Sequence, residues 1–190
     1  AVGSSGRAQP AVDGDACVGF VGLGAIGSPL ATAVLGTGRP MAVFDPRAEA
    51  MQPLVEGGAR ACASPAEVAR HAPTVMASLP TPAVVAEALR GEDGLLAGGR
   101  METFIDLSTT GVQTARELSA LLAERGVAYL DAPVSGGVAG AEAGTLGVFA
   151  AAAPDVFEAN RELLEPFSKV IVLVGEDPGM GQLAKVLNNL

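Results

Sequence analysis

The first residues that could do chemistry form a glycine loop near the start of the chain. Gly22, Gly24 and Gly27 are spaced as G-x-G-x-x-G, after an apolar run and before a segment with helical character. In this spacing the first glycine permits a tight turn, the second lets a pyrophosphate approach the backbone, and the third lets a helix pack closely on a strand. The N-terminus of that helix adds free N–H groups and a positive dipole, which favour phosphate. The loop therefore predicts a dinucleotide site, with an ordinary glycine-rich turn as the alternative.

An acidic residue supports the dinucleotide interpretation. Asp45 ends the second apolar run, about 20 positions after the loop, where an acidic side chain accepts hydrogen bonds from the adenosine ribose hydroxyls. The same carboxylate would repel a 2′-phosphate, which favours NAD over NADP. Arg47 follows two positions later and could accept that phosphate, or could be a solvated surface charge. The residues therefore predict NAD as the cofactor and leave NADP possible.

A second glycine turn stands late in the chain, in "DAPVSGGVAGAEAGTL", where Ser135 precedes Gly136 and Gly137. A glycine pair is unfavourable inside a strand or a helix, so we expect this pair in a turn outside both. Its approachable N–H groups and the serine hydroxyl would suit a carboxylate ligand. From the residues alone, a plain turn without a ligand is the favoured alternative.

The last segment carries a lysine and an asparagine on one helical face. Lys185 and Asn189 are four residues apart, and Gln182 falls on the same face, because residues three and four apart are neighbours on a helix. Apolar residues line the other side, namely Leu183, Val186, Leu187 and Leu190. From this pattern alone a solvated polar stripe on an amphipathic helix is favoured over a functional site.

Strands that alternate with helices must position these residues. Apolar runs predict strands near 16–24, 41–45, 74–80, 103–108, 127–133, 144–153 and 169–175. Amphipathic segments and their glycine or proline boundaries predict helices near 26–35, 48–59, 82–89, 114–126, 154–167 and 181–190. This alternation predicts an α/β fold of the Rossmann type, a doubly wound and mostly parallel sheet with helices on both faces.

Composition excludes several classes of function. The chain has 190 residues, enough for one domain with a sizeable core. Its net charge of −9 and lack of a basic run argue against nucleic acid as a partner, and no apolar run is long enough to span a membrane. Cys17 and Cys62 have no metal-binding spacing, and His71 is the single histidine, so we expect no metal site and a reducing, cytoplasmic location.

Four segments, taken in order, resemble the signature segments of the β-hydroxyacid dehydrogenase family. This family includes 3-hydroxyisobutyrate dehydrogenase and tartronate semialdehyde reductase, and it is related to 6-phosphogluconate dehydrogenase. The third and fourth segments are specific to the family, and the likeness covers residues 17–190. The segments are "GFVGLGAIGSPLA", "DLSTT", "DAPVSGGVAGAEAGTL" and "GMGQLAKVLNN".

The resemblance implies a role for each matching residue. Ser135, Gly136 and Gly137 would bind the carboxylate of a small substrate, Lys185 would be the catalytic acid/base, and Asn189 would orient the substrate. The reaction would interconvert a 3-hydroxy acid and its 3-oxo acid or semialdehyde by hydride transfer. Leu79 and Pro80 would lie along the adenosine side of the cofactor, and Thr109 would lie near the nicotinamide. The loop that would hold the pyrophosphate consists of Gly22, Leu23, Gly24, Ala25, Ile26 and Gly27.

The resemblance also implies a division of the chain. Residues 1–14 would be a flexible tail or linker, 15–178 the dinucleotide-binding domain, and 179–190 the start of an interdomain helix. Family members continue into an all-helical domain that closes the cleft and usually makes the dimer. We therefore expect a homo-oligomer for the full-length protein, and residues 1–190 alone to bind NAD but catalyse little. In that state Lys185 would lie in open solvent with an ordinary pKa.

The sequence departs from the family pattern at three places. Val112 stands where the family usually has a proline after "STT", alanines at 150–152 stand where a glycine pair usually ends a strand, and 83–85 lack the polar residue that often follows "LP". These positions bear on substrate identity and on fine cofactor geometry. They leave the glycine loop, the Ser-Gly-Gly turn and the lysine unchanged.

Two alternative functions stay open. One is a non-catalytic dinucleotide-binding interaction module, because some relatives have lost the lysine and serve as scaffolds. The other is a relative that acts on imines or on 6-phosphogluconate. The retained Lys185 argues against the scaffold and against imine reduction, and a phosphosugar would need cationic groups that this acidic chain hardly supplies.

Overall fold

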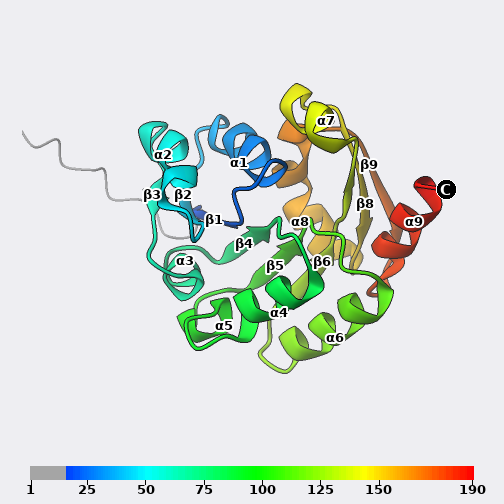
Figure 1. Cartoon of the computed structure of the whole chain (residues 1–190). Helices are drawn as coiled ribbons and strands as arrows, with labels where there is room; N and C mark the ends of the chain where they lie inside the picture. The colour runs from blue at the N-terminus through cyan, green and yellow to red at the C-terminus, as the bar shows by residue number, and fades with distance from the viewer. Residues whose placement is uncertain (1–15) are drawn as a thin grey trace, which may run out of the picture.

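The strands of the chain form one sheet, shown in Figure 1. The computed structural model describes residues 16–190, and the tail expected at 1–14 lies outside the described residues. Within that range the sheet has nine strands in the order β3-β2-β1-β4-β5-β6-β8-β7, with β9 paired to β8. The strands are β1 Val18–Val21, β2 Met41–Phe44, β3 Arg60–Ala61, β4 Thr74–Ala77, β5 Thr103–Asp106, β6 Ala128–Asp131, β7 Val134–Ser135, β8 Leu146–Ala151 and β9 Ser168–Gly175.

Helices cover both faces of this sheet. One face packs against α1, α2, α7 and α8, and the other against α3, α4, α5 and α6. In Figure 1, α9 lies beyond both sets, beside β8 and β9. The helices are α1 Gly27–Leu35, α2 Ala48–Glu56, α3 Pro65–His71, α4 Pro82–Arg90, α5 Leu95–Gly98, α6 Val112–Ala123, α7 Gly137–Ala143, α8 Pro154–Leu164, the 3₁₀ turn η1 Glu165–Phe167, and α9 Met180–Asn188. The predicted fold class is confirmed.

The direction of the strands changes partway along the sheet. All pairings from β3 through β6 are parallel, while β8 runs antiparallel to β6 and β7 and parallel to β9. The first six strands have the order 3-2-1-4-5-6, so the chain leaves β1 toward opposite edges of the sheet. Ligands of such sheets bind at this switch point, outside the carboxyl ends of the strands.

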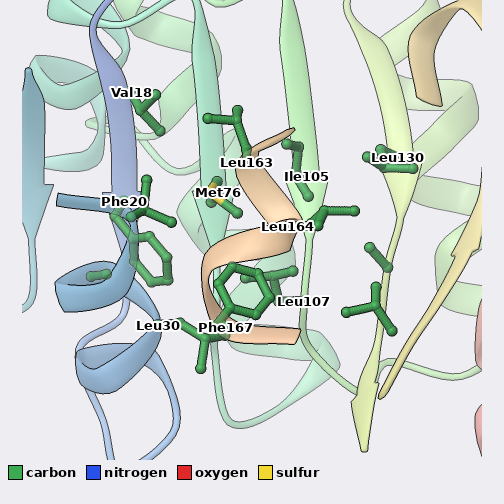
Figure 2. Packing of buried hydrophobic residues seen from close by; sticks show 14 of the residues in the cluster. Val18, Phe20, Leu30, Met76, Ile105, Leu107, Leu130, Leu163, Leu164 and Phe167 are labelled. Atoms are coloured by element: carbon green, nitrogen blue, oxygen red, sulfur yellow. The ribbon is translucent and has the colours of Figure 1, made fainter. Parts of the chain in front are cut away.

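Alternating side chains of the strands build the two halves of the core. Phe20 and Met76 point to the face covered by α1 and α8, where they meet Leu164 and Phe167, as Figure 2 shows. Their neighbours Val21, Val75 and Ala77 belong to the opposite cluster. Because both faces are covered, the strands are near-continuous apolar runs. No helix among the described residues is both long and apolar enough to cross a membrane.

The structure contains five short elements that the sequence analysis did not predict: β3, α3, α5, β7 and α7. The expectation that the glycine pair lies outside strands and helices holds for Gly136 and was wrong for Gly137. Ser135 ends β7, Gly136 is the N-cap of α7 and Gly137 is its first residue. The two glycines have φ angles of 132° and 64°, and this left-handed backbone turns the chain from strand into helix with no loop between them.

Candidate functional site

The residues selected from the sequence gather at the carboxyl ends of the parallel strands. The glycine loop follows β1, Asp45 follows β2, and Leu79 and Pro80 follow β4. Thr109 lies after β5, and its side chain is exposed while Ser108 and Thr110 on either side are buried. The Ser-Gly-Gly turn comes shortly after β6. One edge of the sheet therefore carries both the predicted cofactor residues and the predicted substrate residues.

The three glycines of the first loop have different roles. Gly22 has a φ of 90°, and a Cβ there would overlap the carbonyl oxygen of Ser78. A Cβ at Gly27 would overlap the carbonyl oxygen of Gly22, so the helix can approach the strand only without a side chain. A Cβ at Gly24 would have no atom within 4 Å. Gly22 and Gly27 are thus needed by the fold, whereas Gly24 leaves space for a ligand.

A cavity of about 760 Å³ opens above this loop. Most of the predicted cofactor residues line it: Gly22, Gly24, Ala25, Ile26, Gly27, Asp45, Leu79 and Pro80. Leu23 instead lies in the core, and Thr109 does not line the cavity. The cavity is also lined by Pro65, Val84, Glu87 and Asp93. Sequence reasoning missed them because they come from the unpredicted α3, from the surface of α4 and from the segment between α4 and α5.

The N-terminus of α1 faces this cavity without a side chain of its own to cap it. Its N-cap residue, Ile26, makes no side-chain hydrogen bond, and its first turn holds no acidic residue. Backbone N–H groups at such an end attract an anion. The loop, the open face of Gly24 and the uncapped helix therefore fit the pyrophosphate of a dinucleotide.

Asp45 is tied to the glycine loop and to Arg47. The N–H of Leu23 donates to Asp45 Oδ2 at 2.8 Å, and Arg47 donates to Oδ1 from its backbone N and from Nε, both at 3.0 Å. Arg47 Nη2 also donates to the carbonyl oxygen of Leu23 at 3.2 Å. Burial raises the pKa of Asp45, but the hydrogen bonds from Arg47 and Leu23 outweigh it, so the pKa lies below its ordinary value. Asp45 is therefore a carboxylate at the rim of the cavity at neutral pH.

The second part of the site joins the Ser-Gly-Gly turn to α9. Asn188 Nδ2 donates to Ser135 Oγ at 2.9 Å, and Lys185 Nζ donates to Asn189 Oδ1 at 3.3 Å. The structure thus brings Asn188 against the serine, while Asn189, the residue predicted to orient the substrate, bonds Lys185. Only the doubled asparagine of "LNN" hinted at this residue in the sequence. Lys185 is half-buried, and burial lowers its pKa, so the expectation of an ordinary pKa in open solvent was wrong.

Gln182 corrects the interpretation of α9 as a solvated polar stripe. Its side chain is fully buried. Its Oε1 accepts from the N–H of Thr110 at 2.9 Å and of Gly111 at 3.0 Å, and its Nε2 donates to the carbonyl oxygen of Ser108 at 3.1 Å and to Asp131 Oδ1 at 2.7 Å. The apolar residues expected on the other side, Leu183, Val186, Leu187 and Leu190, are exposed.

Two buried carboxyl groups lie beneath this part of the site. Asp106 and Asp131 are register partners at the ends of β5 and β6, and both are fully buried. Burial raises the pKa of Asp106 to about 7, although hydrogen bonds from Ser108 oppose the rise. Burial also raises the pKa of Asp131, against hydrogen bonds from Gln182 and Gly179. Within residues 16–190 no group of three or more acidic, histidine or cysteine side chains could hold a metal ion.

Comparisons with known proteins show which family the chain resembles. The profile of the NAD binding domain of 6-phosphogluconate dehydrogenase matches residues 17–175. The chain is 41% identical over 174 residues to a probable mitochondrial 3-hydroxyisobutyrate dehydrogenase of Dictyostelium discoideum, covering 91% of this chain and 54% of the relative. It is 40% identical over 173 residues to an NAD-dependent L-serine dehydrogenase of Pseudomonas aeruginosa, covering 90% and 58%.

Solved structures show the same likeness. A 3-hydroxyisobutyrate dehydrogenase of Mycobacterium tuberculosis, solved with L-serine, superposes with a TM-score of 0.84 at 37% identity, covering 92% of this chain and 59% of that one. An imine reductase of Streptomyces aurantiacus gives a TM-score of 0.82 at 26% identity, covering 91% and 60%. The chain thus spans a little over half the length of the relatives it matches.

Proposed function

The chain belongs to the β-hydroxyacid dehydrogenase family and carries its NAD-binding domain, and from this premise we propose that the full-length protein interconverts a small 3-hydroxy acid and its 3-oxo acid or semialdehyde. One observation carries the proposal. The hydrogen bond from Asn188 to Ser135 joins the Ser-Gly-Gly turn to the helix that bears Lys185, at the same edge of the sheet as the glycine loop.

Each residue of this group has a chemical task in the proposal. Ser135 and the backbone N–H groups of Gly136 and Gly137 hold the substrate carboxylate, and Asn188 and Asn189 orient the substrate beside them. A bound nicotinamide supplies the hydride acceptor or donor. Lys185 takes the hydroxyl proton during oxidation and, as an ammonium, returns a proton during reduction. Burial lowers the pKa of Lys185, which brings the amine closer to the protonation balance that an acid/base at neutral pH needs.

We propose NAD rather than NADP as the preferred cofactor. Asp45 is a carboxylate that lines the cavity, and the guanidinium of Arg47 is engaged by it. The Asp45 carboxylate would repel a 2′-phosphate, and Arg47 could bind that phosphate only if its ion pair with Asp45 broke. Titration by cofactor fluorescence should therefore give a lower Kd for NADH than for NADPH. A clear preference for NADPH would mean that Arg47 leaves Asp45 when the cofactor binds.

The acid/base role of Lys185 is tested by Lys185→Ala in the full-length protein. Loss of a positioned acid/base lowers the rate about 100- to 10,000-fold, while the Kd for NADH stays within about twofold because the glycine loop is unchanged. Lys169→Ala is the matched control, since Lys169 is an exposed lysine on β9. Most of kcat surviving in Lys185→Ala would rule out the acid/base role.

The choice of substrates in the same assay separates the alternatives. Turnover of 3-hydroxy acids supports the proposal, whereas turnover of cyclic imines or of 6-phosphogluconate alone would favour a different branch of the fold. Cofactor binding without any turnover would favour a non-catalytic module. Fold likeness by itself does not decide among them.

The exposure of the substrate side sets an expectation for residues 1–190 on their own. Asn188 and Asn189 are exposed, and Lys185 is only half-buried. We propose that this chain binds NAD but turns substrate over slowly, because water competes for the substrate groups in an open cleft. The division into 15–178 and 179–190, a homo-oligomer for the full-length protein and a cytoplasmic location stay predictions from the sequence.

A further inference from the structure

Gln182 occupies a place in the structure that the proposed chemistry does not explain. Its amide makes four hydrogen bonds, to the N–H groups of Thr110 and Gly111, the carbonyl oxygen of Ser108, and Asp131. A side-chain amide has one acceptor oxygen with two lone pairs and two N–H donors, so this glutamine uses its full capacity. A fully buried and fully bonded amide is a rigid connection.

Asp131 holds the beginning of the same helix. Its Oδ2 accepts from the N–H of Gly179 at 3.1 Å and of Gln182 at 3.3 Å, while α9 has no capping side chain of its own. A carboxylate at a helix N-terminus satisfies free N–H groups and complements the helix dipole. A Cβ at Gly181 would lie 2.5 Å from the carbonyl oxygen of Phe149 and 2.9 Å from Asp131 Oδ2. The first turn of α9 is therefore in close contact with β6 and β8.

The same connection reaches the loop after β5. Ser108, Thr110 and Gly111 surround Thr109, which is the residue predicted to lie beside the nicotinamide. On the helix, Lys185 follows Gln182 by three residues and so lies next to it on the helix surface. The outer side of α9 is exposed at Leu183, Val186 and Leu187. The position of Lys185 relative to Thr109 is thus set mainly from the Gln182 side of the helix.

We infer that Gln182, anchored by Asp131, is a positioning residue that holds Lys185 and the Thr109 loop in fixed relation to each other. The inference rests on the proposed function, in which Lys185 acts on a substrate held beside the nicotinamide. Hydride and proton transfer need the reacting groups aligned, and a shift of about 1 Å in such a group can lower the rate about 100-fold. In this inference Gln182 touches neither substrate nor cofactor, and it acts through the two segments that it joins.

The main test is Gln182→Met, which keeps the length of the side chain and removes all four hydrogen bonds. The matched control is Gln113→Met, because Gln113 is an exposed helical glutamine that bonds Glu117. The chain has two lysines, Lys169 and Lys185, so NMR titration of ¹³Cε-labelled lysine resolves each. We expect the midpoint of Lys185 to move toward that of a free lysine in Gln182→Met, while Lys169 and both lysines of the control are unchanged.

Amide hydrogen exchange and enzyme kinetics give two further measurements of the same variant. In Gln182→Met the amides of Thr110 and Gly111 should lose hydrogen-exchange protection, and kcat of the full-length protein should fall up to about 100-fold. The Kd for NADH should stay within about twofold, because Gln182 lies outside the cofactor cavity. An unchanged Lys185 titration and an unchanged kcat in the folded variant would overturn the inference.

A charge swap keeps the inference testable if Gln182→Met does not fold. Gln182→Glu places a second carboxylate against Asp131, whereas Gln182→Glu with Asp131→Asn restores an amide–carboxylate pair in reverse. The double variant should regain the Lys185 midpoint and part of kcat relative to Gln182→Glu, and no recovery would overturn the inference. If the native protein shows no turnover, the proposed function fails, while the lysine titration and the exchange of Thr110 and Gly111 still decide the positioning role.

Discussion

At the glycine loop and at the beginning of α9, a helix starts beside the carboxyl ends of the parallel strands. The two helix starts are fixed by different interactions. The glycine loop follows β1 directly, and its long-range side-chain hydrogen bonds join Leu23 to Asp45 and Arg47, which are 22 and 24 positions away. The start of α9 is held by Asp131 and by the loop around Thr110, which are 48 to 74 positions away in the sequence.

This difference separates the two halves of the proposed chemistry. The cofactor side is shaped by backbone geometry within one strand–helix–strand unit, where Gly22 and Gly27 give the loop its form and Gly24 leaves space for a ligand. The substrate side is shaped by buried polar hydrogen bonds between distant segments. Substitutions on the cofactor side should therefore change cofactor binding. Substitutions on the substrate side should change the pH dependence of stability and the turnover rate, while NADH binding persists.

The largest effect is expected at Gly27. In Gly27→Ala the new Cβ overlaps the carbonyl oxygen of Gly22, so the helix must move away from the strand, at a cost of about 3 kcal/mol of unfolding free energy or more. NADH binding should be lost with it. Thermal unfolding by circular dichroism and NADH titration measure the two effects.

Gly24→Ala is the control for that variant. A Cβ at Gly24 has no atom within 4 Å, so the unfolding free energy should stay within about 0.5 kcal/mol of the native value, while NADH binds more weakly because the methyl group occupies the ligand's space. Equal loss of stability in both variants would contradict the distinct roles given to these glycines.

The next largest effect is a change of stability with pH, which arises at the buried Asp106 beneath the substrate side. The pKa of Asp106 is about 7 in the folded protein and about 3.9 in the unfolded chain. The folded state therefore binds more protons between these values, and stability falls as pH rises through this window, by about 2 kcal/mol from pH 5 to pH 7. Asp106→Asn stays neutral beside Asp131 and Tyr129, so it should lose this slope and be more stable than the native protein at pH 8.

Unfolding in urea at a series of pH values measures that slope. Asp177→Asn serves as the control, since Asp177 is exposed and its replacement should leave the slope as it is. If the native protein and Asp106→Asn gave parallel curves between pH 5 and pH 8, Asp106 would have to be ionised throughout that range.

The smallest effect is expected at the second glycine turn. Gly137 has a φ of 64° and free space around a Cβ. Gly137→Ala should therefore lower the unfolding free energy by about 1 kcal/mol, because alanine is strained in the left-handed backbone. Gly38→Ala has the same kind of cost, with a φ of 85° and free space, and it lies away from the substrate side. Both should bind NADH normally, and only Gly137→Ala should raise the KM for the hydroxy acid. An equal KM in the two variants would argue that the turn does not hold the carboxylate.

Much of the fold and of the cofactor side could be predicted from the sequence because their signals are local. Apolar runs that alternate with amphipathic segments specify a doubly wound sheet, and the structure has it. The spacing of Gly22, Gly24 and Gly27 and the position of Asp45 depend on backbone rules that hold wherever a strand leads into a phosphate-binding helix. These residues line the cavity above the glycine loop.

The short elements could not be predicted in the same way. The α7 helix, Gly137–Ala143, contains glycine and alanine at most positions, and such a segment has almost no periodic signal and a low intrinsic tendency to be helical at its glycines. It forms because Ser135 pairs with Gly147 in β7 and β8, and because Ala141 packs into the core.

The substrate side was decided by the tertiary structure. The sequence by itself determined that α9 is an amphipathic helix with Gln182, Lys185 and Asn189 on one side, and it favoured solvent for that side. Burial of a polar side chain is stable only when its hydrogen-bond partners are in place, and the partners of Gln182 come from β6 and from the loop after β5. Helical periodicity records which residues share a face, but it carries no information about which distant segment will cover that face.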